Sequence, residues 1–447
     1  MSARLCACSL VVCWLMPASG VVPAGLPAAS NRGVHEAGQV EIGEDDDRFL
    51  EDLARRSFTY FWEQADPGTG LIRDRSKTDG TVSSEGAAEI ASIAAVGFGL
   101  TGLCIAAERG WVPSLAVRAR ARATLRFLLE RMPHERGWFY HFVDRRSGAR
   151  AWQSELSSID TALLLAGVLT VRRCFADDPG IARDAERIYR RVDFRWMLAG
   201  HPALLSHGWR PESGFLDNRW GRYCELMILY LLAIGSPAHP IPAAAWHAWT
   251  RPTMTFQGFT YVSWSDPLFV HQYSHAWVDF RGRRERQTGI DWFANSVTAT
   301  QAHRAFCLSL STEFPGYTEH VWGITASDSR KGYVAWGGPP RHAAIDGTVV
   351  PAAAAGSLMF VPGVTLPALR EMHRRFGDRI YGRYGFADAF HPTDGWVNPD
   401  VIGIDLGITL LSAENLRTGR VWAWFMENPE IVRALDVAGV TSSNHEP

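Results

Sequence analysis

Apolar residues along this chain of 447 residues recur with helical periods, and two kinds of helical segment alternate. Residues 45–64 have an acidic start and an apolar stripe through Leu50, Leu53 and Phe58, which predicts a helix with one buried face. Residues 86–110 are apolar on nearly every face and rich in Ala and Gly. A helix of that kind must be buried among other helices.

The alternation continues, and it predicts the fold class. Charged segments at 115–132 and 182–198 are each followed by an apolar one, and the apolar segments number six: 86–110, 157–174, 222–235, 295–310, 351–360 and 404–416. Six inner helices surrounded by six outer ones make an (α/α)6 barrel, with two separate helical bundles as the alternative. Short Gly- and Trp-rich stretches such as 331–339 are expected to form small β-hairpins in the loops.

The predicted domain organisation is simple. Residues 1–20 have Arg4, an apolar stretch and then small residues, which predicts an export signal too short to span a bilayer. A linker at 21–44, one helical domain at 45–437 and a flexible tail at 438–447 follow. We therefore expect an exported protein, periplasmic or secreted, that is monomeric and has no stable membrane insertion. Four cysteines of the mature chain fall in apolar contexts, so buried free thiols are expected at Cys104, Cys174, Cys224 and Cys307.

Composition and charge exclude several classes of partner and cofactor. The formal net charge is -2, and without a long basic cluster nucleic acid is not an expected partner. The chain also has no Gly-rich phosphate loop, GxSxG elbow or paired CxxC, so no cofactor is predicted. Among 18 Trp and 22 Phe, several aromatic residues stand in polar loops, where they either stack on pyranose rings or fill the core: Trp138, Tyr140, Trp152, Trp322 and Trp396.

Three acidic residues, Asp160, Glu225 and Asp405, each stand near the start of an apolar helical segment. In a barrel of helical hairpins the inner helices all point the same way, so these carboxylates would meet at one mouth. Glycosidic bond cleavage with inversion needs a protonated acid and a second carboxylate that activates water. Glu225 has the most apolar flanks and is the predicted general acid, while either aspartate is the candidate base.

Each of these residues also has a structural interpretation. Glu225 could form a buried ion pair with Arg219 or Arg222, and Asp160 could belong to a capping box with Ser157. Asp405 could cap its helix. Further loop carboxylates are predicted either to grip sugar hydroxyls or to close turns: Asp74, Glu155, Glu319 and Asp328.

His271 and His275 form an HxxxH pattern, which would place both on one helical face. The Glu that a zinc protease carries in this motif is replaced by Gln272, so no metal is predicted. Hydrogen bonding to sugar or backbone is the favoured role for His271.

Six segments together carry a family resemblance: 154–167, 220–241, 271–281, 317–329, 346–357 and 396–407. The chain resembles the glucoamylase-like domain family, which includes bacterial endo-β-1,2-glucanases of glycoside hydrolase family 144, over roughly residues 45–430. The resemblance implies an (α/α)6 barrel, no metal, and internal cleavage of linear β-1,2-glucan with inversion. It also implies that Glu225 matches the acid and that Asp160 and Asp405 match essential acidic positions.

Two alternatives to an endo-acting glucanase stay open at this point. An exo-acting or transglycosylating relative would share all three carboxylates and differ in how its loops close the cleft. A non-catalytic glucan-binding protein would keep the aromatic cleft, although the presence of Glu225 and both aspartates counts against it.

Overall fold

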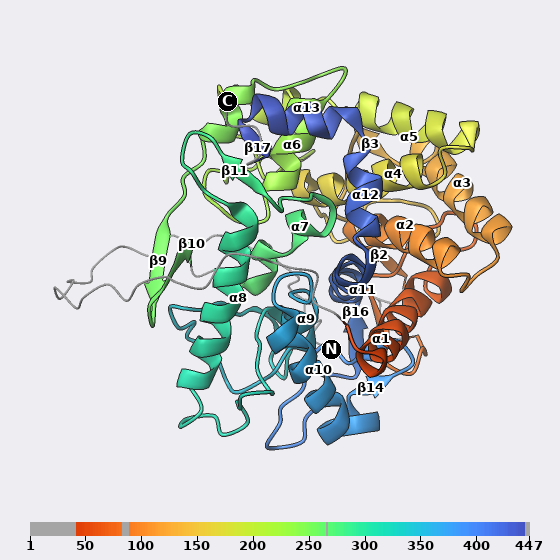
Figure 1. The fold of residues 1–447 in the computed structure, drawn as a ribbon. Coiled ribbons are helices and arrows are strands. Elements are labelled where there is room, and N and C mark those ends of the chain that lie inside the picture. Colours follow the sequence, from red (N-terminus) through yellow and green to blue (C-terminus); the bar gives the residue numbers. More distant parts are fainter. Residues whose placement is uncertain (1–41, 83–88, 265–266, 443–447) are drawn as a thin grey trace.

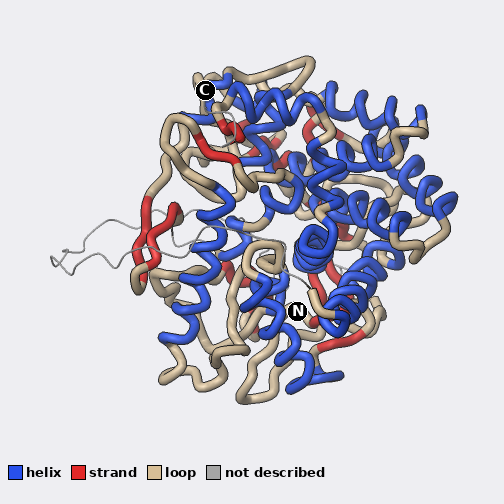
Figure 2. The backbone as a smooth tube through the Cα atoms, in the orientation of Figure 1, coloured by secondary structure: helices blue, strands red, loops and turns tan. Residues whose placement is uncertain are grey.

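The protein is described from a computed structural model that covers residues 42–82, 89–264 and 267–442. The predicted export signal and residues 21–41 of the predicted linker lie outside these ranges. Helices are the main regular elements of the described chain, and the strands are short and lie between them (Figure 2).

Four apolar helices form the interior, and most of their residues are buried on every side. They are α2 (Ile93–Glu108), α4 (Ser158–Cys174), α6 (Met227–Gly235) and α11 (Gly403–Thr418). Helix α4 packs against α2 and α6, and α2 packs against α11. The prediction of buried helices is confirmed for these segments, except that residues 90–92 of the predicted helix at 86–110 form a strand and residues 86–88 lie outside the described ranges.

Five amphipathic helices lie around the apolar ones (Figure 1), and most of their charged residues are exposed or half-buried. Helix α1 packs on α11, α3 and α5 pack on α2 and α4, α13 packs on α6, and α10 packs on α9. Their bounds are Glu44–Glu63 for α1, Ser114–Glu130 for α3, Pro179–Arg191 for α5, Pro362–Phe376 for α10 and Pro429–Val437 for α13.

The remaining helices complete the other side of the molecule. The predicted helix at 351–360 is shorter than expected, because α9 ends at Ala355 and the next residues form turns. The helical elements not yet named are α7 (Tyr273–Trp277), α8 (Trp292–Ser309), α12 (Arg420–Met426) and the 3-10 turns Trp196–Leu198, Ala243–His247, Leu268–His271 and Gly377–Arg379.

Helices α2 and α4 lie unusually close together because two glycines face each other. A Cβ atom on Gly97 would stand 2.2 Å from the backbone oxygen of Leu163, and one on Gly167 would stand 2.1 Å from the oxygen of Gly97. A disulfide joins Cys104 to Cys174 on the same two helices, with Cα atoms 6.0 Å apart. The prediction of free thiols is therefore wrong for this pair, whereas Cys224 and Cys307 are free and buried.

Short strands lead directly into three of the inner helices. Strand β2 (Ile90–Ser92) precedes α2, β6 (Leu156–Ser157) precedes α4 and β16 (Asp400–Ile402) precedes α11. They pair antiparallel with β5 (Phe142–Asp144), β7 (Gly208–Arg210) and β1 (Arg75–Lys77), respectively. These pairings hold the entrances of the inner helices, and the loops that carry polar side chains, at one end of the helical layer.

The other strands form hairpins or close the ends of the chain. Strand β8 (Gly214–Phe215) pairs antiparallel with β7. The hairpins are β3 (His134–Glu135) with β4 (Trp138–Phe139), β9 (Thr253–Phe256) with β10 (Phe259–Val262), β12 (Ala326–Ser329) with β13 (Gly332–Ala335), and β14 (Tyr381–Gly382) with β15 (Gly385–Phe386). Strand β11 (Arg283–Glu285) pairs with β17 (Val440–Ser442). Within the predicted tail, Val440 is buried and residues 440–442 are paired, while residues 443–447 lie outside the described ranges.

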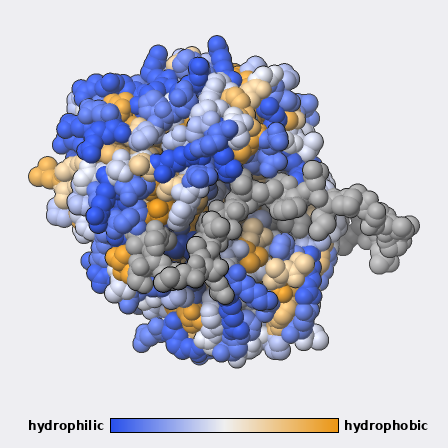
Figure 3. All heavy atoms as spheres, turned by 180° about the vertical axis from the view of Figure 1, so that it is seen from behind, coloured by the Kyte–Doolittle hydropathy of each residue, from blue (hydrophilic) through white to orange (hydrophobic). Residues whose placement is uncertain are grey.

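On the face shown in Figure 3, the apolar residues that are not covered are scattered between polar ones. Among the helices that the structure describes, none combines the length and the hydropathy that crossing a bilayer requires.

Candidate active site

A pocket opens where the entrances of α2, α4, α6 and α11 meet. It encloses about 1040 Å³, including the part open to solvent, and its walls combine carboxylates, histidines and aromatic rings. The polar and aromatic residues that line it are Asp74, Arg75, Ser92, His141, Phe142, Glu155, Ser157, Asp160, His207, Trp220, Glu225, Phe269, Tyr273 and Tyr333. Three carboxylates that lie far apart in the sequence, at 74, 160 and 225, thus share one cavity.

Glu225 lies in the turn just before α6, and its residue is only 5% exposed. Ser274 fixes this turn by donating its hydroxyl to the backbone oxygen of Glu225 at 2.8 Å. Burial, with a contribution from the negative charge of Asp160, raises the pKa of Glu225 to about 7. Arg219 instead donates to backbone oxygens of Leu198 and Leu204. The side chain of Glu225 is therefore a carboxylic acid that is mostly protonated below about pH 7.

Asp160 is the third residue of α4 and lies in its first turn. Ser157 caps the helix by accepting the backbone N–H of Asp160, and its hydroxyl donates to the Asp160 carboxylate at 2.5 Å. The capping interaction is thus present, and the carboxylate faces the pocket as well. Burial raises the pKa of Asp160, while the positive charge of His141 and the hydrogen bond from Ser157 act to lower it.

Asp405 lies in the first turn of α11 but does not cap it, because the cap position is Ile402. Its side chain lines a smaller neighbouring cavity that also contains Asp388. Burial, together with the charge and the hydrogen bond of Asp388, raises the pKa of Asp405 well above its usual range. Burial and the neighbouring Asp388 thus favour the protonated form of Asp405, next to the main pocket.

An arginine links the two cavities. Arg75 donates to Asp74 at 3.0 Å and to Asp328 at 2.5 Å. Asp388 accepts hydrogen bonds from the hydroxyl of Ser327 at 2.6 Å and from the backbone N–H of Asp328 at 3.1 Å. The predicted binding residues Asp74 and Asp328 thus belong to one acidic network.

Glu155, another predicted binding residue, lines the pocket beside a histidine. Its carboxylate lies 3.1 Å from Nδ1 of His141, while Nε2 of the same ring lies 3.5 Å from Asp160. Although burial acts to raise it, the hydrogen bond and charge of His141 lower the pKa of Glu155 to about 2. A negative charge is therefore fixed on Glu155 under all ordinary conditions.

The predicted aromatic residues separate into two groups. Trp152 exposes 46% of its surface, and its ring lies 5.1 Å from that of Phe142 on the pocket wall. Tyr140 is half-buried beneath the guanidinium of Arg150. Trp138 and Trp322 are fully buried in the hydrophobic core, so the stacking interpretation is wrong for both.

Three further predicted residues lie away from the pocket lining. His271 is buried and bonded to the hydroxyls of Tyr223 and Ser263, and it ends a 3-10 turn rather than sharing a helix with His275. Glu319 is exposed and pairs with Arg304, and Trp396 is half-buried. Within the described ranges, no group of three or more His, Cys, Asp or Glu side chains is arranged to hold a metal ion.

The sequence analysis missed several residues that the fold brings to the pocket. His141 and Asp388 stand in loops that carry no motif, and Trp220 lay inside a family segment without being singled out. Trp220 stacks on His207 with ring centroids 3.9 Å apart, and it donates its N–H to Ser158 at 2.7 Å. The one feature of the sequence that could have pointed to His141 is its place as a polar residue between two short strands.

The pocket holds a buried carboxyl group whose pKa is raised to about 7, a second carboxyl group on Asp160 and aromatic rings. Groups of this kind can cleave glycosidic bonds by general acid and general base catalysis. Helical fold and site together define the class of helical glycoside-hydrolase-like proteins.

Comparisons with known proteins agree with this class. Residues 217–429 match the family model Glycoamylase, described as "Putative glucoamylase". A solved structure of the same description from Bacteroides caccae is 30% identical, covers 89% of this chain and 100% of its own, and has a TM-score of 0.83. An endo-beta-1,2-glucanase of Chitinophaga pinensis, solved with sophorotriose and glucose, is 27% identical over 89% of this chain and 99% of its own, with a TM-score of 0.81.

A curated relative from Parabacteroides distasonis is an exo beta-1,2-glucooligosaccharide sophorohydrolase that acts at the non-reducing end. It is 27% identical over 436 residues, which are 87% of this chain and 57% of the relative. The chain thus spans little more than half the length of that protein. Because the Bacteroides caccae structure is matched over its whole length, the chain belongs to the glucoamylase-like family.

Proposed function

We propose that this protein is a glycoside hydrolase that cleaves linear β-1,2-glucan internally and releases sophoro-oligosaccharides. The observation that carries the proposal is the buried carboxyl of Glu225, whose pKa is raised to about 7 in a pocket that it shares with Asp160. The β-1,2 linkage is supported by the two relatives whose activity is described, one endo-acting and one exo-acting.

In the proposed mechanism Glu225 donates a proton to the oxygen of the leaving sugar. Asp160 is the base that we favour, because it lies in the same pocket and the charge of His141 and the hydrogen bond from Ser157 favour its ionised form, whereas burial and Asp388 favour the protonated form of Asp405, which lines the neighbouring cavity. Asp405 then serves as a hydrogen-bond donor or proton store beside Asp388. Inversion at the anomeric carbon follows if a water molecule stands between Asp160 and the sugar.

Asp74, Glu155 and Asp328 are proposed to bind sugar hydroxyls, since carboxylates are strong acceptors for them. Trp152 and Tyr140 are proposed as stacking surfaces outside the pocket.

We also propose the arrangement of the helices, the export of the protein and its oligomeric state. The apolar α2, α4, α6 and α11 and their amphipathic neighbours support an (α/α)6 barrel with two layers. The pattern of residues 1–20 supports export, and a disulfide between Cys104 and Cys174 suits an oxidising compartment. A monomer is proposed. N-terminal sequencing of the protein recovered from the periplasm and the medium tests export and the cleavage position.

The direct test is a time course with purified protein on linear β-1,2-glucan, with starch, β-1,3-glucan and β-1,4-glucan as controls. A ladder of short products from the β-1,2 polymer alone, absent in Glu225→Gln, is the expected result. Release of sophorose alone from the first minutes would assign the exo mode, which the relative from Parabacteroides distasonis favours. No product from any glucan would overturn the proposal. Proton NMR of the first products distinguishes inversion from retention.

A further inference from the structure

His141 is held in place by the backbone and by its neighbours on both sides. It lies between β4 and β5, where its backbone N–H donates to the oxygen of Glu155 at 2.9 Å and its own oxygen accepts from Ile93 at 3.3 Å. Its ring stacks on Phe142 with centroids 3.9 Å apart and planes inclined by 17°. The imidazole therefore has little freedom to turn away from the groups that it faces.

Both ring nitrogens of His141 face carboxylates. Nδ1 lies 3.1 Å from Glu155 and Nε2 lies 3.5 Å from Asp160. A neutral imidazole has a single N–H, so one of the two carboxylates would meet a lone pair. When both carboxylates are ionised, only the imidazolium, with an N–H on each nitrogen, satisfies the two at once.

We propose that His141 is a positioning residue that remains an imidazolium, links Glu155 to Asp160, and keeps Asp160 ionised in the pocket that also holds Glu225. Charges then alternate along a row: negative on Glu155, positive on His141, negative on Asp160 and neutral on protonated Glu225. Each charged group in this row stabilises the protonation state of the group beside it.

Of the other charged groups near His141, the carboxylate of Asp74 supports this state, whereas Arg75 and Arg210 are cations that oppose it. Asp74 adds negative charge from the loop before β1, with Arg75 beside it, and Arg210 on β7 reaches Glu155 at 3.5 Å from the far side. Although burial acts to lower it, the charges of Asp160 and Glu155 raise the pKa of His141 to about 9.

Removing the positive charge has a defined effect on Asp160. Burial already raises the pKa of Asp160, and His141 is the main opposing influence. An opposite charge at this distance lowers a carboxyl pKa by ~1–3 units. Without it, Asp160 takes up a proton at a higher pH, and whatever the ionised form does for the reaction is lost there.

The kinetic test, which rests on the proposed hydrolysis, is the pH dependence of kcat/KM for His141→Gln. The acidic limb is expected to move upward by ~1 pH unit or more. His207→Gln is the matched control, because His207 lines the same pocket and burial lowers its pKa to about 4, so that it is already neutral near neutral pH. Even where His207→Gln changes the rate, the acidic limb of its pH profile should stay in place. An unmoved limb in His141→Gln would overturn the proposal.

A second measurement does not depend on activity or on the folding of His141→Gln. In protein labelled with ¹⁵N-histidine, one ring is expected to stay doubly protonated to about pH 9, and Glu155→Gln should lower the pKa of that ring alone. If every histidine were neutral by pH 8, the imidazolium would be excluded even in an active enzyme. If the signal is present but no glucan is cleaved, only the proposed function fails.

Discussion

Arg150 donates through Nη2 to the backbone oxygen of Gln153 at 2.6 Å, across a turn in which Trp152 and Gln153 both have positive φ, at 51° and 53°. Residues with a Cβ atom adopt this backbone region only at some cost. Arg150 stabilises the turn through a second hydrogen bond, from Nε to the oxygen of Ser154 at 2.5 Å. It is held in turn by an ion pair with Glu212.

The turn presents the Trp152 ring to solvent beside Phe142, so we expect Trp152 to contact a sugar outside the pocket. Trp152→Ala should raise KM for long β-1,2-glucan about fivefold, which corresponds to the ~1 kcal/mol typical of a stacking contact. The kcat should change little, because the contact is the same in the ground state and the transition state.

Arg150→Ala should have a similar effect on KM, since it releases the turn without removing the ring. Leu115→Ala, an exposed apolar position on α3, is the control. Steady-state kinetics on glucans of graded length provide the measurement. Equal losses on short and long substrates would place Trp152 inside the reacting subsites instead.

Much of the fold could be predicted from the sequence because burial leaves a periodic trace. A helix that is apolar all round, such as α2, can only be interior, and a carboxylate at its entrance is conspicuous. Asp160 and Glu225 were found in this way.

The remaining parts of the site depend on tertiary contacts that leave no local pattern. His141 gains its importance from Glu155 and Asp160, which reach it through strand pairing. Asp388 comes close to Asp405 only when the loop before β16 is folded. The sequence left open whether Trp138 and Trp322 stack on sugars or fill the core, because a polar neighbour in the sequence does not say which way an indole points. Cys104 meets Cys174 only through the packing of α2 on α4.

The raised pKa of Glu225 predicts how the rate depends on pH. A general acid must be protonated, so activity should fall above about pH 7, approaching tenfold per pH unit. The acidic limb should follow Asp160. A kcat/KM profile on linear β-1,2-glucan from pH 4 to 9 measures both limbs, and a constant rate between pH 7 and 9 would contradict Glu225 as the donor.

The same pKa predicts that Glu225 destabilises the fold at neutral pH. A carboxyl whose pKa is higher in the folded than in the unfolded protein binds its proton more tightly when folded, so stability falls as pH rises between the two values. The change from the ordinary 4.5 to about 7 corresponds to ~3 kcal/mol. Glu225→Gln, which imitates the protonated group, should therefore be more stable than the wild type at pH 8 and equal to it near pH 4.

Chemical denaturation at several pH values measures this difference in the free energy of unfolding. Glu130→Gln, at the exposed end of α3, should show no such dependence on pH. A wild type that is as stable as Glu225→Gln at pH 8 would show that the acid is not held in a desolvated site.

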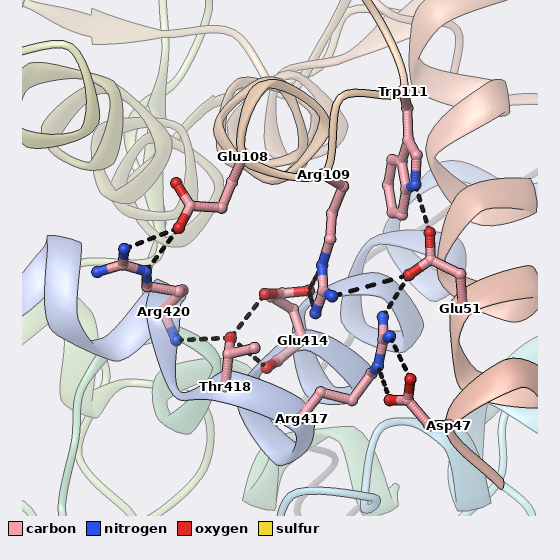
Figure 4. A network of polar contacts seen from close by, with 9 residues as sticks. All are labelled: Asp47, Glu51, Glu108, Arg109, Trp111, Glu414, Arg417, Thr418 and Arg420. Carbon is pink, nitrogen blue, oxygen red and sulfur yellow. Dashed lines mark hydrogen bonds and ion pairs between the residues drawn. The ribbon is translucent and has the colours of Figure 1, made fainter. Parts of the chain in front are cut away.

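The buried ion pair between Arg109 and Glu414 gives a prediction on the side of the inner layer where α2 ends (Figure 4). Arg109 follows the last residue of α2 and donates to Glu414 on α11 at 2.9 Å, and the Glu414 side chain is only 1% exposed. Thr418 donates to the other carboxylate oxygen at 2.6 Å. Arg109→Ala would leave the Glu414 charge buried with this hydroxyl as its main partner, which typically costs ~3–5 kcal/mol.

The same region offers a matched control in Arg420 and Glu108, an ion pair whose side chains are 48% and 43% exposed. Arg420→Ala should lower the free energy of unfolding by ~0–1 kcal/mol, because water and salt already screen that pair. Adding Glu414→Gln to Arg109→Ala should recover much of the loss, since the unpaired charge is then gone. Denaturant unfolding of the four proteins tests the argument. Equal losses from Arg109→Ala and Arg420→Ala would mean that water reaches Glu414 and that burial of its charge does not govern the junction of α2 and α11.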